Sequence, residues 1–119
     1  MKWKYTEQAK AIAIKIEANE DKKIAGWAYL YVLYSDRHDE PYGFLENLYV
    51  EKKYRGRGFG TELVQRVIEE ARKQGCYKLI GTTRYAKREV HAFYQHLGFK
   101  NFGIEFRMDL AKSKVKQSD

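Results

Sequence analysis

The stretch "YRGRGFGTELVQRVIEEARKQG", residues 54–75, places glycines at positions 56, 58 and 60 and then runs directly into a helical pattern. The apolar residues that follow recur at helical spacing, at Leu63, Val64, Val67, Ile68 and Ala71. Gly75 is placed to end that helix. Glycines before a helix let the backbone approach a ligand closely, and the free N–H groups of the first helical turn favour an anion. The stretch therefore predicts a phosphate-binding loop at the start of a helix.

Two well-known phosphate loops do not fit this spacing. The Walker pattern requires a lysine directly after its last glycine, but Thr61 follows Gly60 here. The dinucleotide pattern GxGxxG is not met by glycines at positions 56, 58 and 60. Hydrolysis of nucleoside triphosphates and nicotinamide chemistry are therefore disfavoured.

The rest of the chain alternates strand patterns with one more helical pattern. We expect strands at residues 11–17, 24–34, 44–50, 77–83 and 101–110, and a second helix that carries Val90, Phe93, Tyr94 and Leu97 and ends at Gly98. The run 24–34 is apolar on both faces, which predicts helices on both faces of the sheet. The first three strands follow one another closely, so they should form an antiparallel meander.

Length and composition limit the remaining possibilities. A chain of 119 residues predicts a single domain, 1–119, with a disordered polar tail at about 112–119. The formal charge of +7 suggests an anionic partner. One cysteine and no Cys/His cluster predict no metal site, and no apolar run is long enough to span a membrane. We expect a cytoplasmic protein without a membrane partner.

Two motifs in the chain resemble the GCN5-related N-acetyltransferase (GNAT) family. Arg55, Gly58 and Gly60 match its Arg/Gln-x-x-Gly-x-Gly/Ala signature, and "HAFYQHLGF" resembles its "FYxxxGF" element. The two matches cover about residues 44–100. The resemblance implies a mixed, mostly antiparallel sheet whose fourth and fifth strands, "FLENLYV" and "YKLIGTT", splay apart around acetyl-CoA. Only about ten residues precede "AIAIKIE", so the N-terminal helices of the family should be shortened or absent.

The resemblance also implies roles for individual residues. Glu46 lies in a strand similar to the "YLEDFFV"-type strand of spermidine/spermine acetyltransferases and would be the general base, and Tyr94 would be the general acid. A surface carboxylate and a packed aromatic ring are the respective alternatives. The residues implied to bind acetyl-CoA are Leu48, Tyr49, Val50, Arg55, Gly56, Arg57, Gly58, Phe59, Gly60, Thr61 and Lys87. Lys87 stands where family members often carry asparagine.

The resemblance therefore implies an acetyl-CoA-dependent N-acetyltransferase acting by direct attack in a ternary complex. The acceptor would be a primary amine: a small amine or polyamine, or a protein N-terminus or lysine. Two alternatives stay open, a basic nucleic-acid-binding module that uses the ten tyrosines for stacking and a non-catalytic acyl-CoA sensor. Nucleic acid is disfavoured because Trp27, Tyr29 and Tyr31 have core spacing. By family analogy, residues 101–110 would pair two copies of the chain as a homodimer.

Overall fold

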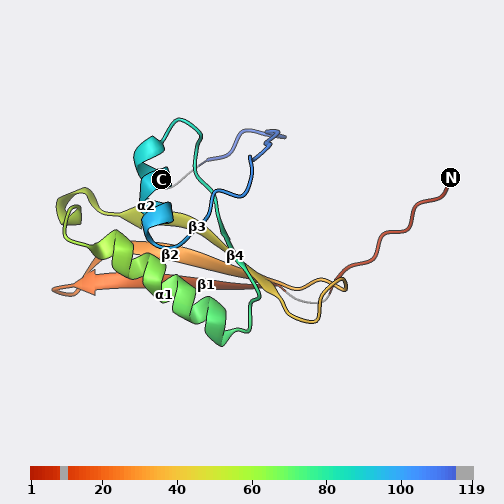
Figure 1. Ribbon diagram of the computed structural model, residues 1–119, viewed down its shortest axis with the longest axis horizontal. Coiled ribbons are helices and arrows are strands. Elements are labelled where there is room, and N and C mark those ends of the chain that lie inside the picture. The colour runs from red at the N-terminus through yellow and green to blue at the C-terminus, as the bar shows by residue number, and fades with distance from the viewer. Residues whose placement is uncertain (9–10, 115–119) are drawn as a thin grey trace.

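Three long strands follow one another and pair as an antiparallel meander: β1 (Ala11–Glu20), β2 (Lys23–Leu33) and β3 (Tyr42–Val50). In this computed structural model, which describes residues 1–8 and 11–114, a short strand β4 (Leu79–Gly81) pairs with β3 in parallel. The strand order is β1-β2-β3-β4 (Figure 1). The predicted mixed, mostly antiparallel sheet is confirmed, although β1 is longer than expected and β4 is shorter.

Glycine precedes the first helix and follows both helices. After the short 3-10 helix η1 (Lys52–Tyr54), α1 (Phe59–Lys73) follows Gly58 directly, and α2 (Arg88–His96) follows β4. Gly75 and Gly98, just past the two helices, have φ of +82° and +101°, a left-handed conformation that glycine adopts readily. Residues 1–8 form neither helix nor strand.

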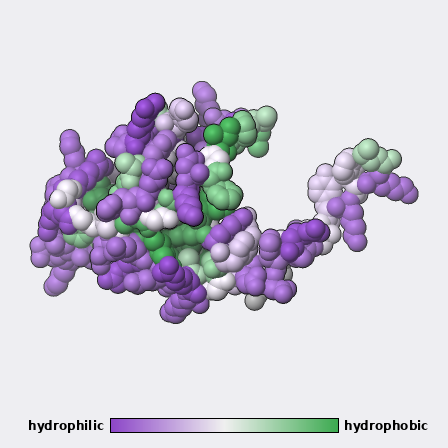
Figure 2. All heavy atoms as spheres, viewed as in Figure 1, coloured by the Kyte–Doolittle hydropathy of each residue, from purple (hydrophilic) through white to green (hydrophobic). Residues whose placement is uncertain are grey.

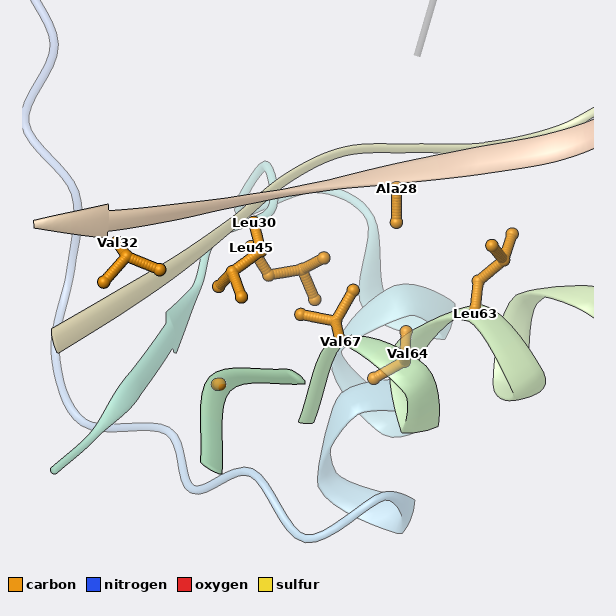
Figure 3. Close-up of a cluster of buried hydrophobic side chains, with 8 residues drawn as sticks. Ala28, Leu30, Val32, Leu45, Leu63, Val64 and Val67 are labelled. Carbon is orange, nitrogen blue, oxygen red and sulfur yellow. The ribbon is translucent and has the colours of Figure 1, made fainter. Parts of the chain in front are cut away.

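The hydrophobic core lies between the sheet and α1. Its fully buried side chains come from β2, β3 and α1 and point toward one another (Figure 3): Leu30, Val32, Leu45, Leu63, Val64 and Val67. The second helix packs on the same side. Gly81 pairs with Leu45, so a side-chain carbon added there would point to the face of Leu45, and it would lie 3.6–3.7 Å from Tyr94 and Phe99.

The expectation of helices on both faces is therefore wrong for the described residues. The opposite face of the sheet carries half-buried aromatic side chains, among them Trp27, Tyr29 and Tyr31. The ring of Tyr29 stacks on that of Tyr31, and the ring of Trp27 contacts Tyr49 of β3. The run 24–34 is therefore apolar on both faces because the rings on its second face partly bury one another, and no second helical layer is needed in the described residues.

The predicted strand at 101–110 is also wrong. The segment forms no strand, and its apolar side chains are open to solvent, with Phe102 98% and Phe106 87% exposed. In Figure 2 they form a hydrophobic patch that projects from a largely hydrophilic surface. The alternating pattern supplies an apolar face, but β4 offers only a three-residue edge for pairing. Residues 112–114 form no helix or strand, and the rest of the predicted tail, 115–119, lies outside the described residues.

Candidate functional site

An open strand edge is the first feature of the site. Pairing between β3 and β4 runs from Gly43–Leu79 to Leu45–Gly81 and stops there, whereas β3 continues to Val50. Among the described residues, positions 46–50 thus have no strand partner on the side of β4. The predicted splaying of these two strands is confirmed, and it leaves main-chain groups free at the edge.

A β-bulge reshapes β3 at this edge. Tyr29 pairs with Glu46 and Trp27 pairs with Tyr49, so Asn47 and Leu48 stand opposite a single residue of β2. Asn47 has φ of +53°, a left-handed conformation that asparagine tolerates better than most residues. The bulge brings Glu46 and Tyr49 to the same face of the sheet although they are three positions apart, a spacing that would otherwise place them on opposite faces.

The glycine loop leads from β3 into α1. Gly56 and Gly58 have φ of +80° and +87°, and a side-chain carbon added at either would meet nothing within 4 Å. Glycine is thus favoured there by backbone conformation and not by crowding. Gly58 is the N-cap of α1 and supplies no capping side chain, so the first-turn N–H groups of α1 have no side-chain acceptor at the N-cap.

A pocket of about 790 Å³ lies where the open edge, the glycine loop and the starts of both helices meet. Of the residues predicted to bind acetyl-CoA, it is lined by Leu48, Tyr49, Val50, Arg55, Gly56, Gly58, Phe59, Gly60 and Lys87. Arg57 and Thr61 do not line it. The sequence motif and the pocket therefore coincide over most of their length.

Two cations among the lining residues could contact an anion in the pocket. Arg55 donates from Nε to the carbonyl oxygen of Val50 at 2.8 Å, and its guanidinium lies 5.5 Å from the ring of Tyr49. Lys87 is the N-cap of α2 and is half-buried. Arg57 instead forms an ion pair with Glu20 at 2.7 Å, which ties the loop to the end of β1. A phosphate contact by Arg57 would require it to leave that carboxylate.

The two predicted catalytic side chains lie on opposite sides of the sheet and outside the pocket lining. Glu46 is exposed on the aromatic face, in register with Tyr29. Tyr94 is half-buried on the helical face, 5.2 Å from Phe99 between ring centres, and burial raises the pKa of its hydroxyl. The open edge of β3 lies between the two faces.

Four lining residues were not predicted: Tyr54, Glu89, Val90 and Phe93. Tyr54 is buried and meets the ring of Phe59 edge-on at 5.8 Å. Val90 and Phe93 were recognised as the apolar face of a helix, but a helical pattern does not say what that face contacts. Nothing in the sequence distinguishes Glu89 from an ordinary first-turn carboxylate.

Other reactive groups do not form a second centre in the described part of the chain. No group of three or more His, Cys, Asp or Glu residues there could hold a metal ion. Burial raises the pKa of the Cys76 thiol, which favours its protonated form. None of the helices in residues 1–8 and 11–114 combines the length and the apolar content of a membrane span.

Known proteins resemble this chain in sequence and in fold. Residues 2–99 match the model of the Acetyltransferase (GNAT) family. Glucosamine 6-phosphate N-acetyltransferase of Trypanosoma brucei brucei is 35% identical over 68 residues, which are 57% of this chain and 44% of that protein. This chain thus spans less than half the length of that relative.

Two solved structures share the fold. A chain from Agrobacterium tumefaciens str. C58, named in general terms as an acetyltransferase, superposes with a TM-score of 0.76 at 33% identity and covers 82% of this chain and 68% of its own. AAC(6')-Iy in complex with the bisubstrate analogue CoA-S-monomethyl-acetylneamine gives a TM-score of 0.67 at 24% identity, over 82% and 69% of the two chains. At that identity the similarity supports the fold alone.

Proposed function

Because the chain belongs to the acetyltransferase (GNAT) family, whose model matches residues 2–99, we propose that it is an N-acetyltransferase that uses acetyl-CoA to acetylate a small primary amine. The observation that carries this proposal is the pocket at the glycine loop, which joins a helix N-terminus to an open strand edge. The helix N-terminus suits the diphosphate of acetyl-CoA, and the open strand edge suits its extended, amide-containing pantetheine arm.

The fit to the diphosphate of acetyl-CoA rests on backbone donors and charge. The left-handed glycines at 56 and 58 leave open space around the loop, and the first turn of α1 offers N–H groups together with the positive end of the helix dipole. Arg55 and Lys87 add positive charge to the lining. The donor set is thus that of an anion site.

The fit to the pantetheine arm rests on the edge of β3. Glu51 donates its N–H to Ala25 of β2 at 2.8 Å, so the main chain of Val50 points the other way, toward the open edge. The Val50 carbonyl already accepts from Arg55, which leaves its N–H as the free group for an amide oxygen. The arm would extend the sheet by one strand.

The reaction forms a C–N bond, breaks the C–S bond of the thioester, and moves a proton from the amine to the sulfur. We assign Glu46 as the base that takes the proton from the attacking nitrogen, directly or through a water. Tyr94 is the proposed acid for the departing thiolate, and its burial keeps the hydroxyl protonated. The N–H of Leu48, at the bulge, would hold the negative charge that develops on the carbonyl oxygen.

The first test is calorimetric titration of the protein with acetyl-CoA, followed by an assay of thiol release with glucosamine 6-phosphate, neamine and spermidine as amines. We expect binding that Arg55→Ala weakens, release with at least one amine, and loss of the rise in rate with pH in Glu46→Gln. Glu40→Gln, in the hairpin loop between β2 and β3, is the matched control and should behave as the wild type. Absence of acetyl-CoA binding in the wild type would overturn the proposal.

A further inference from the structure

The face of the sheet opposite α1 has an ordered arrangement of rings and charges. Two neighbouring rows cross its three long strands, Lys15–Tyr29–Glu46 and Glu17–Trp27–Tyr49. Residues paired across antiparallel strands share a face, so all six side chains lie on this one. The rings of Trp27, Tyr29 and Tyr49 are called here the platform.

Lys15 shows that the platform attracts a cation. Its ammonium lies 5.4 Å from the centre of the Trp27 ring and 5.8 Å from that of Tyr29, and it forms an ion pair with Glu17 at 3.0 Å. These distances are within the range of cation–π attraction. The hydrogen bond with Glu17, assisted by Tyr29, raises the pKa of Lys15. A carboxylate and two rings thus hold one ammonium group on this face.

On the β3 side of Tyr29, a carboxylate and aromatic rings again lie together, but among the described residues no lysine accompanies them. Glu46 pairs with Tyr29 from β3, as Lys15 does from β1. Tyr49 lies beside Glu46 on the same face, in the row of Trp27. Within residues 1–8 and 11–114 the Glu46 carboxylate forms no ion pair or hydrogen bond. The guanidinium of Arg55 already lies 5.5 Å from the Tyr49 ring and is anchored through Nε to the carbonyl of Val50. Tyr29 and Glu46 are therefore the groups on this side that remain open to an ammonium group.

We propose that the platform and Glu46 together recognise the ammonium group of the acceptor, an alkylamine whose apolar stem lies on the rings. The inference rests on the proposed function and names the substrate class of the same site. Tyr49 lines the pocket as well as the platform, so an amine bound there lies at the border of the acetyl-CoA site, beside the proposed base. Lys15 is then an internal competitor for the same rings.

A binding experiment tests this without any acetyl transfer. Trp3 and Trp27 are the two tryptophans of the chain, so a Trp3→Phe protein reports on the platform by fluorescence. The probes are n-hexylammonium and its neutral counterpart hexan-1-ol. We expect a saturable change in Trp27 fluorescence with the ammonium, and binding of the alcohol that is weaker by about tenfold. Equal affinity for the two probes would overturn the proposal.

The direction in which Lys15→Met changes n-hexylammonium binding distinguishes a role in amine recognition from a role in folding alone. In the Trp3→Phe background, Lys15→Met should tighten n-hexylammonium binding because it removes a competing cation, whereas Tyr29→Leu and Glu46→Gln should weaken it. Lys78→Met is the matched control. Lys78 also lies over two rings, 5.2 Å from Tyr42 and 5.3 Å from Tyr77, and Tyr42 is roughly 13 Å along β3 from Glu46 at 3.3 Å per residue. A Lys15→Met protein that folds but binds the probe more weakly contradicts the proposal, and so does an equal gain in Lys78→Met.

Calorimetry with acetyl-CoA keeps the two proposals apart. Lys15→Met and Tyr29→Leu should bind acetyl-CoA as the wild type does, because neither residue lines the pocket. If the wild type binds n-hexylammonium but not acetyl-CoA, the proposed function fails while the platform stands. If acetyl-CoA binds and amines are acetylated, Tyr29→Leu should raise the KM for the amine alone, and an unchanged KM overturns the role of the platform.

Discussion

The glycine loop makes its sharpest prediction at Gly58. This residue has φ of +87° and ψ of 4°, and a methyl group there would meet no atom within 4 Å. The cost of Gly58→Ala is therefore conformational, about 1–2 kcal/mol for a residue with a side chain in the left-handed region. For a domain of this size, that cost lowers the thermal midpoint by roughly 3–10 °C.

Gly60→Ala, two positions further on, should have the opposite sign. Gly60 lies inside α1, and a methyl group there would be 3.8 Å from Phe93 and 3.9 Å from Val50, which are ordinary contact distances. Alanine is favoured over glycine by up to about 1 kcal/mol within a helix. We expect the midpoint to stay or to rise, so the two substitutions form a matched pair.

Thermal unfolding followed by circular dichroism, together with calorimetric titration with acetyl-CoA, measures both effects. If alanine at 58 turns one first-turn N–H away from the ligand, the loss of a bond to a charged group, about 1.5–3 kcal/mol, lowers affinity by roughly 10- to 150-fold. Gly60→Ala should keep its affinity. Equal losses of stability in both variants would refute the backbone argument, and wild-type affinity in a destabilised Gly58→Ala would refute the loop as the anion site.

Three further predictions address other parts of the site. Lys87→Met should weaken the binding of acetyl-CoA about three- to fivefold in low salt and less in high salt. Arg88→Met, which lies outside the pocket lining, should leave the affinity unchanged, and calorimetry at the two salt concentrations measures both variants. Asn47→Val should lower the free energy of unfolding by about 1–3 kcal/mol, measured with denaturant, and slow acetyl transfer, because a β-branched residue resists φ of +53°. Asn47→Gly should keep the stability and the rate of the wild type. Burial raises the folded-state pKa of Tyr94 above its ordinary 10.0, so the wild type should lose stability as the pH rises past 10, and Tyr94→Phe should lose less of its thermal midpoint over that range.

The sequence predicted those parts of the site that depend on local backbone chemistry. Left-handed turns favour glycine, so the loop at 56–58 and the end of α1 at Gly75 could be read from composition and spacing alone. The anion site at the start of α1 followed because a helix N-terminus carries its donors wherever the helix packs. The lining residues of β3 and Lys87 came instead from the family resemblance. The bulge at Asn47 could not be predicted, since it depends on the register between β2 and β3, which no single strand encodes.

The error about the second face of the sheet bears on function. An apolar pattern reports that a face avoids water but not what covers it. In residues 24–34 the second apolar face is covered by its own rings and not by helices. These rings are aromatic instead of aliphatic, and aromatic faces attract cations as Leu or Val side chains cannot, as the ammonium of Lys15 over Trp27 illustrates. If the proposed acceptor platform is correct, the rings of Trp27 and Tyr29 serve cation recognition as well as burial, and the Lys15→Met and Tyr29→Leu variants test this directly.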